Sequence, residues 1–100
     1  MTAYIAGKIT GDPQFLEKFE YTEQQLTARG LKVLNPAILP KGLTPKQYMK
    51  ICFAMIDASD VVYFLNDYKE SAGAMLEWNY CQYTNKNTMG SWTGAEIINA

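Results

Sequence analysis

The sequence predicts an α/β protein, a small three-layer sandwich in which helices cover both faces of a mostly parallel sheet of three to five strands. Three observations carry this prediction. Short apolar runs rich in β-branched and aromatic residues alternate with longer segments whose apolar residues recur every three or four positions. Gly, Pro, Asn and Asp stand between the two kinds of segment. The resulting order is strand, helix, strand, helix, strand, helix, which right-handed crossovers fold into layers.

The first strand and helix are predicted within residues 2–30. Residues 2–7 form a short apolar run that ends in glycine. The loop that follows ends in Asp12 and Pro13, an N-cap residue before a proline at the first helical position. The helix is expected over 14–29, and Gly30 stops it as a C′ glycine would. Its apolar positions are Phe15, Leu16, Phe19, Thr22 and Leu26.

Two further strand–helix pairs follow. Leu31–Leu34 is the second strand, cut off by Asn35 and Pro36. After a loop with Pro40 and Gly42, Thr44 caps a helix with proline at its first position, which runs to Ile56. The third strand is Val61–Leu65. The last helix runs from Ser71 to about Thr84, and the residues expected to face inward are Met75, Leu76, Tyr80 and Tyr83.

The loop after the third strand and the start of the last helix form the candidate site. Ligands bind at the carboxyl ends of strands in open α/β sheets. Glu77 leans toward the helix N-terminus, over Gly73 and Ala74, so a ligand at the helix start can reach its carboxylate across two nearly absent side chains. The plain structural alternative is that the small residues serve helix-to-sheet packing and that Glu77 is a solvated charge.

The periodic pattern ends after Asn85. Residues 86–94 are polar and broken by glycine, and residues 95–98 are too few to assign. The chain 1–100 is therefore expected to be one flavodoxin- or Rossmann-like domain with an irregular or docking tail at 86–100. Its 48% hydrophobic content is typical of a folded globule.

Composition excludes several classes of function. A net charge of −1 gives no electrostatic footprint for a polynucleotide or an anionic membrane. There is no apolar run long enough to cross a membrane and no signal-peptide pattern, which predicts a cytoplasmic protein. Cys52 and Cys81 fall on different helices and are expected to be reduced and structural. Histidine is absent, so no His-based catalysis and no ordinary zinc site is expected.

Several ordered segments resemble the nucleoside 2-deoxyribosyltransferase-like family, in particular a compact branch from bacteria and phages. The resemblance covers roughly the first five-sixths of the chain. The segments that carry it are Tyr4-Ile5-Ala6-Gly7, Ile9-Thr10-Gly11, Val33-Leu34-Asn35-Pro36, Asp60 before the third strand, and Ser71-Ala72-Gly73-Ala74-Met75-Leu76-Glu77.

The resemblance implies an N-glycosidase or 2-deoxyribosyltransferase that acts on a small nucleoside or nucleotide without metal or cofactor. Glu77 matches the nucleophile, which forms a covalent deoxyribosyl intermediate. Tyr4 matches a tyrosine close to it, although a half-buried strand tyrosine is an equal interpretation. Ser71 and the helix start are expected to hold a sugar hydroxyl or a 5′-phosphate, unless Ser71 merely caps. The substrate-binding candidates are Gly7, Lys8, Ile9, Thr10, Ser71 and Gly73.

Two departures from the family pattern leave alternatives open. Cys52 stands where family members often carry an aspartate that helps to protonate the leaving base; Asp67, the third catalytic candidate, or Asp57 would have to substitute. Lys8 stands in place of a usual proline, as a phosphate ligand or, favoured here, a solvated charge. The rival hypotheses are an inactive nucleotide-binding protein, such as a sensor or sequestering module, and an interaction module without a small-molecule site.

Self-association is also expected. A sheet of three or four strands buries little surface, and the region of the last helix carries more aromatic residues than one small core needs. We therefore expect a homodimer, or a higher homo-oligomer, through the region of Trp78, Tyr80, Tyr83 and Trp92.

Overall fold

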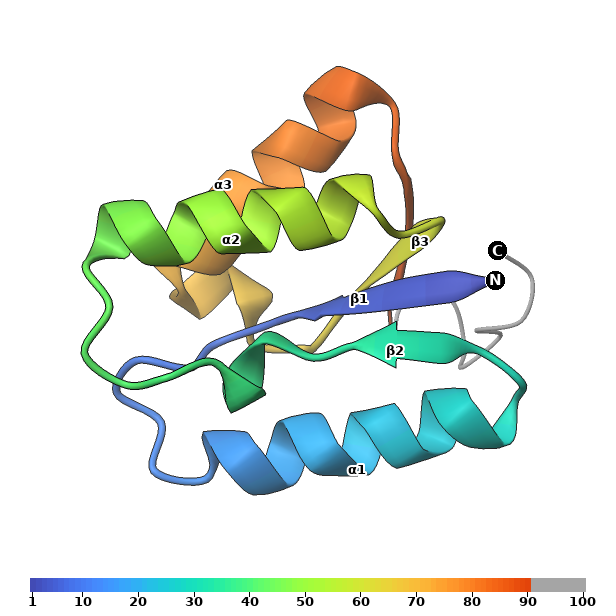
Figure 1. Cartoon of the computed structure of the whole chain (residues 1–100), viewed down its shortest axis with the longest axis horizontal. Helices are drawn as coiled ribbons and strands as arrows, with labels where there is room; N and C mark the ends of the chain where they lie inside the picture. The colour runs from blue at the N-terminus through green and yellow to red at the C-terminus, as the bar shows by residue number, and fades with distance from the viewer. Residues whose placement is uncertain (91–100) are drawn as a thin grey trace.

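The computed structural model describes residues 1–90 and shows a four-stranded parallel sheet with helices on both faces (Figure 1). This confirms the predicted α/β fold class. None of the helices in the described part of the chain is both long and apolar enough to cross a membrane. The elements are β1 (Thr2–Ala6), α1 (Phe15–Ala28), β2 (Lys32–Leu34), η1 (Pro36–Ile38), α2 (Pro45–Asp57), β3 (Val61–Phe64), η2 (Tyr68–Glu70), α3 (Ala72–Thr84) and β4 (Asn87–Gly90).

The strand order is β2-β1-β3-β4, and every neighbouring pair is parallel. In the register, Tyr4 lies opposite Leu34 on one side and Val62 on the other. The chain moves outward from β1 to β2 and then crosses back to β3 on the other side of β1. This reversal is a topological switch point, where open α/β sheets place ligands at the carboxyl ends of the strands.

Alternation along β1 divides the core into two layers. Ala3 and Ile5 pack with α1, whereas Tyr4 and Ala6 pack with the layer of α2 and α3. Figure 1 shows the same arrangement, with α1 on one side of the sheet and the other two long helices on the opposite side. All four of these β1 residues are buried. The odd–even pattern of the strand therefore decides which side chains meet α3, and Tyr4 is one of them.

Local signals at the helix ends are confirmed. Thr44 and Gln47 form a reciprocal capping box at the start of α2, and Pro45 is its first residue. The Ser71 Oγ accepts a hydrogen bond from the Ala74 N–H at the start of α3. α1 ends at Ala28, and Gly30, the C′ residue after the C-cap Arg29, has a φ of +89°. The Gly30 and Leu31 N–H groups then close a Schellman motif, to the carbonyls of Thr27 and Leu26 respectively.

The start of α1 differs from the prediction. The helix begins at Phe15 after Gln14, so Asp12 is not its N-cap. Instead, the Asp12 Oδ1 accepts a hydrogen bond from the Gln14 N–H within the preceding turn, at 2.9 Å. The other oxygen of Asp12 is bound by the Lys18 ammonium from the first turn of α1.

The tail prediction is wrong for Asn87–Gly90, which form the edge strand β4. They pair parallel with β3, and Met89 lies opposite Tyr63. Only backbone groups are needed for this pairing, because β3 offers unpaired N–H and C=O groups along its free edge. A polar, glycine-containing segment can therefore become a strand without showing apolar alternation. Residues 91–100, including Trp92, lie outside the described part of the chain.

The predicted inward face of α3 is also partly wrong. The buried residues are Ala74, Glu77 and Cys81, whereas Leu76 and Tyr83 are 52% and 93% exposed. The inward face of α3 is therefore made of small and polar side chains. Two of the aromatic residues assigned to an interface pack within the chain instead, Trp78 against Phe64 and Tyr80 against Phe53. Self-association stays a prediction.

Candidate functional site

A carboxyl group and a phenol meet between the sheet and α3. Glu77 is only 4% exposed, and Tyr4 is fully buried in the centre of β1. The Tyr4 Oη donates a hydrogen bond of 2.6 Å to the Glu77 Oε2 across 73 residues of sequence. Glu77 reaches this position because its Cβ points toward the helix start, the direction expected from helix geometry. The plain alternative of a solvated Glu77 is therefore excluded.

Burial sets the proton affinity of Glu77. Removal from water raises the pKa of its carboxyl group from 4.5 to about 7, and hydrogen bonds from Tyr4 and Cys52 offset part of this rise. The group therefore changes charge close to neutral pH. A carboxylate with such a pKa is more basic and more nucleophilic than one in water, and it is a chemical signature of functional sites.

Helix α2 covers Glu77 with three side chains of its first two turns. Cys52 is fully buried, and its burial, together with the charge of Glu77, raises the pKa of the thiol to about 11, so the thiol stays neutral. The Tyr48 Oη is buried and has no hydrogen-bond partner in the described part of the chain. The Met49 Sδ lies 3.6 Å from the position that a Cβ on Gly73 would take.

The two candidate glycines differ in their surroundings. A Cβ on Gly7 would lie 2.7 Å from the Leu65 Cδ1 and 3.0 Å from the Leu65 Cβ, so the loop after β1 needs glycine to approach the end of β3. A Cβ on Gly73 would meet only ordinary contacts, with Met49 and with the Ser71 Oγ. Packing around position 73 therefore does not by itself require a glycine.

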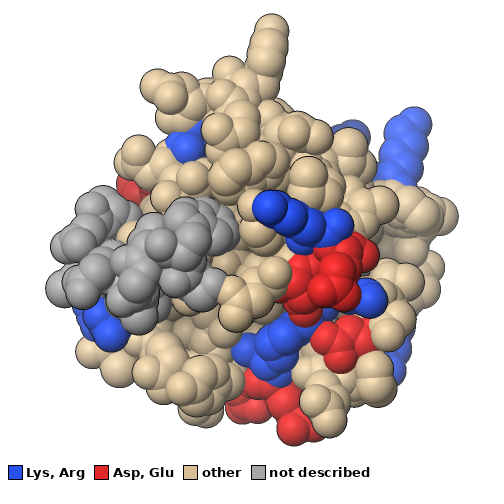
Figure 2. Space-filling model, turned by 180° about the vertical axis from the view of Figure 1, so that it is seen from behind, with Lys and Arg blue, Asp and Glu red and all other residues tan. Residues whose placement is uncertain are grey.

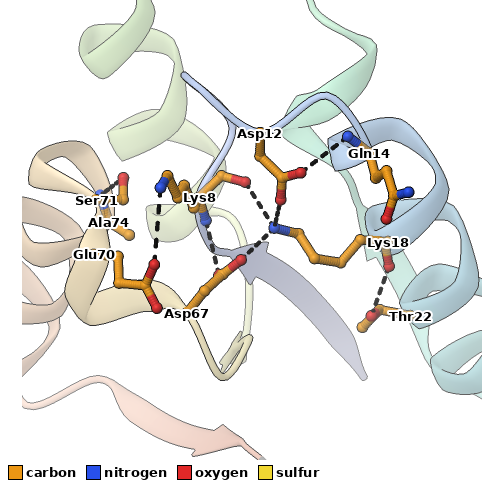
Figure 3. A network of polar contacts seen from close by, with 9 residues as sticks. All are labelled: Lys8, Asp12, Gln14, Lys18, Thr22, Asp67, Glu70, Ser71 and Ala74. Carbon is orange, nitrogen blue, oxygen red and sulfur yellow. Dashed lines mark hydrogen bonds and ion pairs between the residues drawn. The ribbon is translucent and has the colours of Figure 1, made fainter.

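Charged residues join the loops that follow β1 and β3. On the face shown in Figure 2, acidic and basic side chains stand together in one group, and most of the remaining visible face is uncharged. Figure 3 shows the contacts: the Lys18 ammonium binds both Asp12 and Asp67 and donates to the Lys8 carbonyl at 3.0 Å. The Asp67 Oδ1 accepts from the Lys8 N–H at 3.0 Å, and the Lys8 Nζ lies 3.8 Å from Glu70. This network spans the topological switch point.

Two members of the network, Lys18 and Asp12, have pKa values shifted toward their charged forms. Partial burial works to lower the pKa of Lys18, but the hydrogen bonds and charges of Asp12 and Asp67 outweigh it, so that the pKa is raised. The hydrogen bond from Lys18 lowers the pKa of Asp12. Within residues 1–90, this network included, no group of three or more Cys, Asp or Glu side chains is arranged to hold a metal ion.

Comparison with known proteins gives the family and a structural relative. Residues 1–89 match the family model described as Domain of unknown function (DUF4406). The chain belongs to this family. No sequence among curated proteins matches it.

A solved structure of a 2-deoxyribosyltransferase from the psychrotolerant bacterium Bacillus psychrosaccharolyticus is similar in fold to this DUF4406 chain, with a TM-score of 0.70 and 18% sequence identity. The match covers 90% of this chain and 71% of the transferase. The resemblance to nucleoside 2-deoxyribosyltransferases therefore holds at the level of a distant shared fold.

In this DUF4406 domain the predicted site residues separate into groups. Tyr4, Glu77, Ser71 and Gly73 lie around the start of α3. Lys8 and Asp67 belong to the neighbouring charged network, and Asp67 is held by Lys8 and Lys18. Two others lie elsewhere: Ile9 packs against the core layer of α1, and Thr10 is exposed. Asp57 accepts a hydrogen bond of 2.6 Å from the Tyr80 Oη. The functional roles of all these predicted site residues stay predictions.

Two polar residues at the site were not singled out from the sequence. Lys18 lies between Phe15 and Thr22 on the inward stripe of α1, and a lysine at such a position is a signal for a buried ion pair. Tyr48 lies four residues before Cys52, so the two share one face of α2. Its apolar ring fitted the helical pattern, which concealed the inward position of its hydroxyl.

Proposed function

We propose that this DUF4406 domain cleaves the N-glycosidic bond of a 2′-deoxynucleoside or its 5′-monophosphate through a covalent bond between Glu77 and the sugar. One observation carries the proposal: the buried Glu77 carboxyl group, bonded to Tyr4 and with a pKa raised to about 7. The fold shared with a 2-deoxyribosyltransferase supports it. The substrate is a small molecule.

The proposed reaction has two displacement steps. The Glu77 carboxylate attacks C1′ of the sugar, the C1′–N bond breaks, and its electron pair leaves with the base, which takes a proton from water. A water molecule then attacks C1′, the bond between C1′ and the Glu77 oxygen breaks, and the carboxylate is restored with release of one proton. A second base in place of water makes the same chemistry a transfer reaction.

The surroundings of Glu77 suit a nucleophile. Water is largely excluded, so the carboxylate carries no hydration shell that would have to be removed during attack. The Tyr4 Oη fixes one carboxylate oxygen at 2.6 Å, which orients the other oxygen for reaction. The neutral Cys52 thiol adds no competing charge beside it.

Access to Glu77 requires movement above it. At 4% exposure, its carboxyl group is covered, and Met49 is the flexible side chain nearest to Gly73. Methionine is unbranched and adapts to irregular space, so its displacement costs little compared with movement of the sheet. We infer that the sugar enters over Gly73 and Ala74 when Met49 swings aside. A 5′-phosphate would then lie at the start of α3, where N–H groups favour anions.

The direct test is the variant Glu77→Gln. It keeps the shape of the side chain but removes the nucleophilic charge, so base release from 2′-deoxynucleosides and their 5′-monophosphates should fall by about 1,000-fold or more. Release is measured by liquid chromatography of the free base. Glu20→Gln, at an exposed position of α1, is the matched control and should retain full activity. Base release by Glu77→Gln at the wild-type rate would contradict the proposal.

A second candidate is a nucleotide-binding protein without turnover, and the covering of Glu77 by α2 favours it. A site that never releases product has no need of frequent opening. Thermal-shift measurements with deoxynucleosides and nucleotides separate the candidates when run beside the base-release assay. Stabilisation without base release supports binding alone, and base release supports the enzyme.

A further inference from the structure

N-glycosidic cleavage places negative charge on two groups in turn. The Glu77 carboxylate is charged before the reaction, and the base becomes charged as the C1′–N electron pair moves onto it. A hydrogen-bond donor at the departing base stabilises that charge. The Tyr4 Oη already donates to the Glu77 Oε2, so it serves the nucleophile. The leaving group needs a different donor.

Neither aspartate suggested by the sequence is free for this role. Asp57 accepts a hydrogen bond from the Tyr80 Oη at 2.6 Å, and Asp67 accepts from the Lys8 N–H and binds the Lys18 ammonium. In these contacts, both carboxyl groups are acceptors.

Among residues 1–90, the buried Tyr48 hydroxyl beside the candidate site has no strong hydrogen-bond partner. Tyr48 lies one helical turn before Cys52, and its ring packs against the buried cluster that contains Tyr4, Cys52 and Ala74. The residue is partly exposed, whereas its Oη is buried, so the hydroxyl points inward. The neighbouring Cys52 sulfur interacts with the hydroxyl only as a weak hydrogen-bonding atom, so within residues 1–90 the Oη has no full hydrogen-bond partner. Buried hydroxyl groups almost always have a partner, and an exception calls for an explanation.

We propose that the Tyr48 hydroxyl donates a hydrogen bond to the base as it departs, and that Tyr48 is a second catalytic residue beside Glu77. The inference rests on the proposed N-glycosidase function. The hydroxyl lacks a partner in the free protein because its partner is an acceptor atom of the base, which arrives with the substrate.

The helix start holds the donor in place. The Tyr48 N–H donates to the Thr44 carbonyl at 2.9 Å, in the turn fixed by the capping box of Thr44 and Gln47. A donor oriented before reaction needs no reorganisation as charge develops. Burial, with the nearby Cys52 and Glu77, raises the pKa of Tyr48, so it stays protonated. It therefore donates a hydrogen bond without losing its proton, and the base is protonated by water.

The test compares Tyr48→Phe with wild type on two substrates that differ only in leaving group. One is a natural 2′-deoxynucleoside. The other is a para-nitrophenyl 2-deoxyriboside, whose leaving group departs as a stable anion without assistance. Loss of the donor should lower kcat/KM for the nucleoside by about 100-fold and leave cleavage of the nitrophenyl compound close to wild type. Tyr21→Phe, at a 64% exposed position of α1, is the matched control and should change neither rate.

Any other pattern of rates contradicts either the role of Tyr48 or the proposed function. Equal losses on both substrates assign Tyr48 a structural role, and unchanged rates on both remove any role for the hydroxyl; either overturns the inference alone. If wild type cleaves neither substrate, the proposed function falls and this inference with it. Because the removed hydroxyl has no partner, Tyr48→Phe should melt at or above the wild-type temperature. A clear drop would show that the hydroxyl is already satisfied, which also overturns the inference.

Discussion

At the scale of single residues, the burial of Glu77 lowers the stability of the folded protein whenever its carboxyl group is charged. A carboxyl group in an apolar layer is costly to ionise, because the lost hydration is replaced by only a few hydrogen bonds. Tyr4 and Cys52 supply such bonds, yet the pKa still rises to about 7. In the proposed reaction, this poorly solvated carboxylate would be a stronger nucleophile than one in water.

Because Glu77 is buried, the stability of the folded protein is expected to depend on pH. The folded-state pKa of about 7 lies above the ordinary 4.5, so the folded protein binds this proton more tightly than the unfolded chain does. The stabilising contribution is complete below pH 4.5 and is lost as the pH rises through 7, by roughly 3 kcal/mol. Urea unfolding of wild type and Glu77→Gln between pH 4 and 8 measures it.

The difference in unfolding free energy between these two proteins should grow in favour of Glu77→Gln as the pH rises, and then level off. A constant difference across that range would show that the pKa of Glu77 is the same in the folded and the unfolded protein. The same titration should govern catalysis, since only the carboxylate attacks. The value of kcat/KM should therefore rise with pH and reach a plateau above about 7.

At the scale of elements, the first turns of α2 and α3 together form the site. Each has its own side-chain cap, Thr44 for α2 and Ser71 for α3, so each start is rigid. They approach closely where Met49 contacts the small surface of Gly73. The loop after β1 makes a different close approach at Gly7, against Leu65.

Replacing each of the two glycines by alanine is expected to change the stability of the fold in opposite directions. Gly7→Ala places its Cβ within 2.7–3.0 Å of Leu65, which should destabilise the fold by about 1–3 kcal/mol. Gly73→Ala meets no closer atom than the Met49 Sδ at 3.6 Å and improves helix propensity, so the fold should gain up to about 1 kcal/mol. Urea unfolding measures both changes.

For Gly73→Ala, base release should fall although stability rises, because the methyl group occupies the space in front of Glu77. Retained activity in a more stable Gly73→Ala protein would place the sugar elsewhere. Equal stability changes in the two variants would contradict the distinction between a packing glycine and a site glycine.

At the scale of the whole molecule, strand order brings the site together. β1 and β3 are neighbours in the sheet although α1, β2 and α2 lie between them in sequence. The loops that follow these strands are joined by Lys18, whose ammonium binds Asp67 at a separation of 49 residues. The sheet is completed by β4, which covers the outer edge of β3.

If β4 is part of the core, Met89 should matter to stability. It is 3% exposed and packs in the layer of α1, so Met89→Ala should cost about 2–4 kcal/mol of unfolding free energy. Leu76→Ala, at a 52% exposed position, is the control and should cost well under half as much. Urea unfolding compares the two. Similar costs for both would mean that β4 is not packed as described.

Features that depend on residues close in sequence could be predicted without a structure. Apolar runs marked three of the four strands, and Thr44, Ser71 and Gly30 marked helix ends, because caps act over three or four residues. The direction of Glu77 followed from helix geometry alone.

Only the tertiary structure decided what depends on distant partners. The Tyr4–Glu77 bond, the Lys18 network and the inward Tyr48 hydroxyl require a known strand order, because each brings together residues from different elements. β4 forms on the free edge of β3. Its pairing uses backbone groups, so the local sequence pattern does not indicate a strand there. The sequence by itself therefore determined the elements and their ends, while long-range packing determined the chemistry of the site.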